Sequence, residues 1–83
     1  MSETGSIRRT ILRKMFSHGY IGGRHTSLDN LPKGFPSHIR KEVKKIARKL
    51  IKEGLLLRKP THCGEQVSLN PERIDEIRKE IAE

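Results

Sequence analysis

Aromatic residues are scarce in this sequence. The 83 residues include no Trp, one Tyr (Tyr20) and two Phe (Phe16 and Phe35). Proteins that bind single-stranded nucleic acid by base stacking need several exposed rings. The scarcity therefore argues against this binding mode and leaves the hydrophobic core to aliphatic side chains.

Cysteine and long apolar runs are also nearly absent. Cys63 is the single cysteine, which excludes an internal disulfide and fits a reducing compartment. Neither a CxxC nor an HxxxH spacing occurs, so we expect no metal or other cofactor. No apolar run approaches the roughly 20 residues of a membrane span, and the first residues lack a signal-peptide pattern. We therefore expect a cytoplasmic protein without a membrane partner.

Acidic residues are few relative to basic ones. The chain has 18 Lys and Arg against 10 Asp and Glu, a formal net charge of +8, and its isoelectric point is about 10.2. Such an excess indicates a polyanionic partner. Residues 71–83 reverse the balance with five acids against three bases, a net charge of −2 that leaves +10 on residues 1–70. We expect this end to face away from the polyanion.

Amide side chains are rare too, with two Asn and one Gln. Few amides together with abundant Lys, Arg, Glu and Ile are typical of thermophilic proteins, so we expect a thermophilic, archaeal source. The carboxylates have no accompanying His or metal-ligand spacing, and we therefore expect no enzymatic activity.

The first half of the chain predicts two helices. Apolar residues recur at helical spacing from Ser6 to about Ser17, and residues 1–5 before them are expected to be disordered. Thr26 and Asp29 match a helix-capping pattern and predict a short helix over residues 27–33. Pro32 removes a backbone donor, so this helix is expected to be one or two turns, or 3₁₀.

The second half predicts a long helix, a hairpin and a terminal helix. Ser37 as a cap and Gly54 as a stop bound a helix over residues 37–53. Residues 55–69 form two apolar-rich segments around a turn and predict a β-hairpin, and Asn70 before a proline starts a helix over residues 71–82. The expected fold is one α+β, mostly helical domain over residues 6–83, in the order helix, helix, helix, strand, strand, helix.

The predicted helix 37–53 carries an unusual charge. It holds seven of the 18 Lys and Arg but only two acids, Glu42 and Glu53. At 100° per residue its apolar residues share one side and its bases form a stripe on the opposite side. Like charges four residues apart repel, so we infer that a partner uses this charge. The major groove of B-DNA admits one helix.

These elements resemble the winged helix-turn-helix family. The resemblance covers most of residues 7–82 and is most recognisable in ARKLIKEGLLLRK. There Leu50, Gly54 and Leu55 occupy the fixed positions of the family's L-x-x-x-G-L-x-x pattern, and Leu57 its last position. In that family the third helix enters the major groove, and the hairpin, or wing, meets the backbone or the minor groove.

The resemblance implies a small basic DNA-binding protein, a transcription regulator or chromatin-associated factor that prefers double-stranded DNA to RNA. The helix has few Asn, Gln and Ser, so phosphate contacts should give affinity rather than sequence selectivity. The resemblance places the following residues against nucleic acid: Ser37, His38, Arg40, Lys41, Lys44, Lys45 and Arg48 on the helix, and Arg58, Lys59 and His62 on the wing.

Other functions remain open at this point. Winged helices also occur in ribosomal proteins, which makes an RNA-binding or ribosome-associated role the main alternative. A protein-interaction module with the terminal helix as its interface is a further one. Ile74, Ile77 and Ile81 form a stripe on that helix, which either packs on the first helix or pairs with a second copy in a homodimer.

Overall fold

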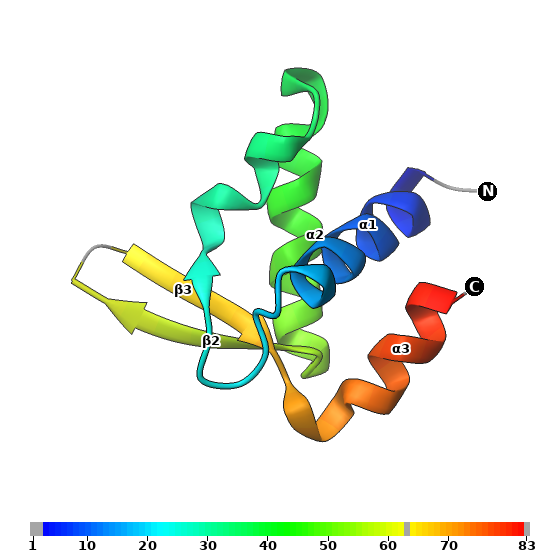
Figure 1. Cartoon of the computed structure of the whole chain (residues 1–83). Helices are drawn as coiled ribbons and strands as arrows, with labels where there is room; N and C mark the ends of the chain where they lie inside the picture. Colours follow the sequence, from blue (N-terminus) through cyan, green and yellow to red (C-terminus); the bar gives the residue numbers. More distant parts are fainter. Residues whose placement is uncertain (1–2, 63, 83) are drawn as a thin grey trace.

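The computed structural model describes residues 3–62 and 64–82, which form a small α+β fold (Figure 1). Within these ranges, no helix has the length and apolar character needed to cross a membrane. The elements in chain order are α1 (Glu3–Ser17), β1 (Thr26–Ser27), the 3₁₀ turns η1 (Leu28–Asn30), η2 (Pro32–Gly34) and η3 (Ser37–Ile39), α2 (Arg40–Glu53), β2 (Leu56–Thr61), β3 (Gly64–Leu69), the 3₁₀ turn η4 (Pro71–Arg73) and α3 (Ile74–Ala82).

The sheet is antiparallel, with strand order β1-β3-β2. The predicted hairpin is present, and its register runs from Leu56 opposite Leu69 to Thr61 opposite Gly64. β1 adds two residues to the other edge of β3, with Thr26 opposite Val67. Periodicity could not predict β1, because a two-residue strand shows no alternation.

The core lies where α1, α2 and α3 meet the sheet. All core side chains are at most 5% exposed, and they come from every one of these elements. Gly54 ends α2 as predicted, because its left-handed φ of 85° lets the chain turn directly into the hairpin. The core residues are Ile7, Ile11, Leu12, Met15, Leu28, Val43, Ile46, Ala47, Leu50, Leu55, Leu56, Val67, Leu69 and Ile77.

The segment expected as a short helix of one or two turns, or as 3₁₀, forms the two 3₁₀ turns η1 and η2. Because β1 precedes them, the order of elements differs from the predicted one. Thr26 lies in β1 and does not cap a helix. Ser27 does so instead, and its Oγ accepts a hydrogen bond from the Asp29 N–H at 3.3 Å. Pro32 has no N–H to continue the turn, and a separate 3₁₀ turn starts there.

The bounds of the other helices also differ in detail. Residues 37–39 are 3₁₀ rather than α-helical, and Ser37 makes no capping bond because Pro36 occupies the cap position. Residues 3–5, expected to be disordered, belong to α1, whereas residues 1–2 lie outside the described ranges. Asn70 caps the terminal helix as predicted, since its side chain accepts a hydrogen bond from the Glu72 N–H at 3.0 Å.

The isoleucine stripe of α3 packs inside the chain. Ile77 has no exposed surface, and Ile74 and Ile81 are partly buried against the core. The Ile77 side chain therefore has no surface with which to contact a second copy in this structure. The alternative left open by the sequence, docking within the chain, is the observed one.

Arg8 joins the three α-helices through ion pairs. Its Nη1 and Nη2 atoms each lie 2.7 Å from a carboxylate oxygen of Glu53 on α2. Its Nη2 also lies 3.0 Å from Glu80 Oε1 on α3, and its Nε donates to the other oxygen of that carboxylate. Hydrogen bonds from Arg8 lower the pKa of Glu53. One guanidinium thus fixes how α2 and α3 lie against α1.

We expect Glu53→Gln to destabilise the fold by roughly 1 kcal/mol at neutral pH, because the half-exposed pair is screened by water. The pKa of Glu53 is lower in the folded state, so its contribution is full above the ordinary value of about 4.5 and is lost as the pH falls through the lowered value. Urea unfolding at several pH values checks this. Glu42→Gln is the control, since Glu42 is exposed on the same helix. A difference between wild type and Glu53→Gln that persists at the lowest pH would contradict the assignment.

We expect Ile77→Ala to lower the free energy of unfolding by about 2 to 5 kcal/mol, the usual range for truncating a fully buried isoleucine. Ile74→Ala should cost clearly less, because Ile74 is only partly buried. Urea denaturation of both variants measures the difference. Equal losses would show that α3 does not pack as described.

Candidate nucleic-acid interface

α2 has two opposite faces with different chemistry. Val43, Ala47 and Leu50 have no exposed surface and anchor the helix to the core. Burial of this face forces the opposite face into solvent, where it carries a row of cations. The exposed basic residues of α2 are Arg40, Lys41, Lys45, Arg48, Lys49 and Lys52.

The hairpin extends this cationic surface beyond α2. A cleft between α2 and the hairpin, here called the basic cleft, is lined by residues of both elements. Figure 1 shows the hairpin on one side of α2 and α3 on the other. The acidic chain end therefore lies away from the cleft. The lining residues are Lys45, Arg48, Lys49, Ile51, Lys52, Arg58 and Glu65.

Glu65 links the two walls of the basic cleft. Its Oε2 lies 3.0 Å from Arg58 Nε on β2, and its Oε1 lies 4.0 Å from Arg48 Nη1 on α2. The register explains the first contact: Arg58 is opposite Val67, so Glu65 is its diagonal neighbour on the same face. The carboxylate thus lies between two arginines that are ten residues apart in the chain.

The wing residues predicted from the sequence do not all share one face. Successive side chains of a strand point to opposite faces, so Lys59 lies on the face opposite to Arg58 and away from the basic cleft. Lys59 is paired in register with Gln66, whose side chain hydrogen-bonds to His25. His62 is exposed at the tip, and Cys63 beside it lies outside the described residues. Only Arg58 joins the α2 cations.

The remaining predicted residues gather at the N-terminal end of α2. Ser37 and His38 are exposed on η3, just before the helix. Arg40 donates from Nε to the Phe35 carbonyl at 3.3 Å. Lys44 is half-buried and lies 2.9 Å from Asp29 of η1, and its hydrogen bond lowers the pKa of that carboxyl. Two of these cations are therefore already tied to the segment that precedes α2.

Three charged residues of the basic cleft, Lys49, Lys52 and Glu65, were not among the predicted binding residues. Lys49 and Lys52 follow Lys45 at the i+4 and i+7 positions, so the helical spacing contained their signal. Glu65 had no such signal, because its position depends on the strand register. In the described ranges, no group of three His, Cys, Asp or Glu side chains is placed to hold a metal ion.

No protein-family model matches this chain, and the comparisons with curated proteins and with solved structures give no match. The geometry and charge of the molecule are therefore the basis for any functional assignment.

Five cations line the basic cleft against the one carboxylate of Glu65. We expect Glu65→Gln to strengthen binding of duplex DNA by about threefold to tenfold at low salt, because a like charge near the phosphates is removed at a partly screened site. Fluorescence anisotropy with a labelled duplex measures the effect. Glu72→Gln, the same change on the acidic chain end, is the control and should leave affinity unchanged. Weaker binding by Glu65→Gln would mean that the carboxylate is needed to position the two arginines.

Proposed function

We propose that this protein binds double-stranded DNA as a winged helix-turn-helix protein, with α2 in the major groove and the β2–β3 hairpin as the wing. The observation that carries the proposal is the row of cations on the exposed face of α2, continued across the basic cleft by Arg58. A transcription regulator or a chromatin-associated factor would need such a surface.

The dimensions of α2 suit this role. Its 14 residues give a length of about 21 Å at 1.5 Å per residue. Val43, Ala47 and Leu50 on the opposite face are buried in the core, so the helix can enter a groove only with its cations foremost. Lysine and arginine side chains would reach the phosphates on the two sides of the groove, and such contacts fix position without reading sequence. We therefore infer high affinity with little sequence preference.

The 3₁₀ turns before α2 take the place of the first helix of a helix-turn-helix. η1 is held to α2 by the ion pair of Asp29 and Lys44. η2 is followed by Phe35, whose carbonyl oxygen accepts a hydrogen bond from Arg40 of α2. In the proposed complex this short segment steadies the N-terminal end of α2, the part that would lie deepest in the groove.

RNA is the principal rival ligand. The major groove of an A-form duplex is deep and narrow and does not admit a helix. An RNA duplex would therefore meet the same cations only across its phosphates. A competition between duplex DNA and a structured RNA of equal length, at two salt concentrations, separates the two roles.

Charge reversal tests the assignment of the surface. We expect Lys45→Glu/Arg48→Glu to reduce DNA affinity by at least about a hundredfold at low salt and to flatten the dependence of log affinity on log salt by roughly two units. The matched control is Arg78→Glu/Lys79→Glu, which makes the same charge change on exposed positions of α3. Far-UV circular dichroism should be unchanged in both. Equal losses in the two variants, or none in the first, would refute the proposed interface.

A further inference from the structure

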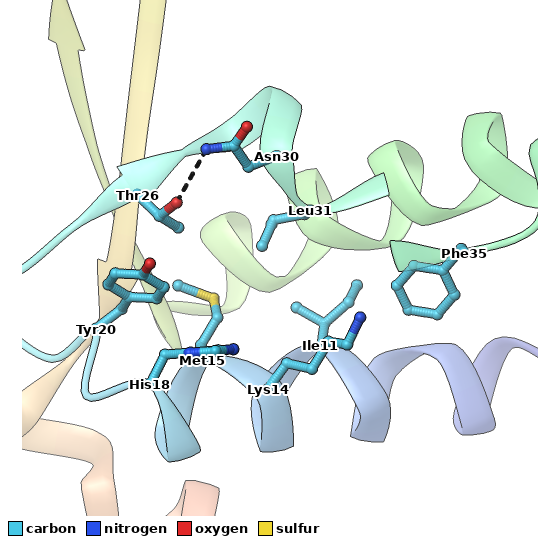
Figure 2. Close-up of a pocket in the computed structure, with 9 residues that line it drawn as sticks. All are labelled: Ile11, Lys14, Met15, His18, Tyr20, Thr26, Asn30, Leu31 and Phe35. Carbon is cyan, nitrogen blue, oxygen red and sulfur yellow. Dashed lines mark hydrogen bonds between the residues drawn. The ribbon is translucent and has the colours of Figure 1, made fainter. Parts of the chain in front are cut away.

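A second cleft lies between α1 and the segment from Thr26 to Phe35 (Figure 2). It shares no lining residue with the basic cleft. Its volume is about 190 Å³. For comparison, an apolar cavity of about 150 Å³ in another protein accommodates benzene. This α1 cleft therefore has room for one six-membered ring with a small substituent.

The walls of the α1 cleft are largely apolar and aromatic. Ile11 and Met15 of α1 are each 1% exposed and contribute its inner wall. Figure 2 shows Tyr20 near one end and Phe35 at the other, with Leu31 between them. Aromatic rings and a polarisable thioether favour a flat, apolar ring as the ligand body.

The charge of the α1 cleft has one sign. Lys14 is an exposed cation on its rim, and no Asp or Glu is among the lining residues. Its ammonium lies 5.5 Å from the centre of the Phe35 ring and beside the backbone of Gly34, where a Cβ would approach it to 1.9 Å. Lys14 forms no ion pair with any residue that the structure describes. A negatively charged ligand group would supply the missing partner.

Polar groups at the opposite end leave further hydrogen-bonding capacity. The Asn30 amide donates to Thr26 Oγ1 at 3.4 Å, which leaves its carbonyl oxygen and a second N–H for a ligand. The Tyr20 hydroxyl also faces this end. We propose that the α1 cleft binds a small aromatic carboxylate, with the ring against Met15 and Leu31 and the carboxylate on Lys14.

The segment that forms one wall of the α1 cleft also contacts the cations of α2. Asp29 pairs with Lys44, and the Phe35 carbonyl accepts from Arg40. A ligand that fixes this segment would therefore change how these two cations are presented to DNA. This regulatory consequence rests on the proposed function, whereas binding of the carboxylate does not.

Benzoate is a suitable probe, followed by methyl and amide NMR shifts of the full chain without nucleic acid. A ligand of about nine non-hydrogen atoms should bind with a dissociation constant near the millimolar range. Shifts should concentrate on Met15, Leu31 and their neighbours. Lys14→Gln should weaken binding about threefold to fivefold, since it removes a charge-assisted contact at an exposed site. Lys33→Gln, which removes an exposed charge outside the cleft, should not. Leu31→Trp, which fills the cleft, should abolish the shifts.

The proposal is overturned if benzoate causes no localised shifts, if the two lysine variants bind it equally, or if benzyl alcohol binds as tightly as benzoate. A separate titration measures DNA affinity with and without saturating benzoate. A protein that binds benzoate through Lys14 but does not bind DNA would retain the ligand site and refute the proposed function. A protein that binds DNA but not benzoate would refute the ligand site and leave the proposed function intact.

Discussion

The burial of one face of α2 is the constraint on which the rest of the structure depends. Val43, Ala47 and Leu50 have no exposed surface, and they can be covered only if α1, the hairpin and the 3₁₀ segment all pack around the same helix. In an α-helix the residues between such positions must point the other way. The cationic surface is therefore a consequence of the core packing, and any change that rotates α2 would displace both together.

Hydrophobic periodicity and capping residues were sufficient to predict the main helices and the hairpin. Gly54 and Asn70 act at chain turns through local hydrogen bonds and backbone angles, so their roles could be predicted from their neighbours alone. β1 was not predicted, and 3₁₀ geometry over residues 28–34 was expected only as an alternative to one or two helical turns, because these elements are two or three residues long and show no periodicity. Pro32 did signal that a regular helix would fail there.

Contacts between residues far apart in the chain could not be predicted from the sequence. Arg8 pairs with Glu53 and Glu80, which lie 45 and 72 positions away in the chain. The sequence contains many other cations that could have paired with these carboxylates. Glu65 reaches Arg48 and Arg58 because of the hairpin register. The isoleucine stripe of α3 was visible, but its pattern is the same whether α1 or another chain covers it. The candidate site was therefore predictable in its helix and only partly in its hairpin.

The outer edge of the hairpin also affects whether molecules of this protein associate with one another. In the described structure β2 is paired only on the side of β3, so its other side is a sheet edge. Such edges invite strand-by-strand association between molecules. Pro60 has no N–H to offer a neighbouring strand, and Arg58 and Lys59 beside it place like charges along the same edge. The outer strand is thus built to resist the growth of intermolecular sheets at high protein concentration.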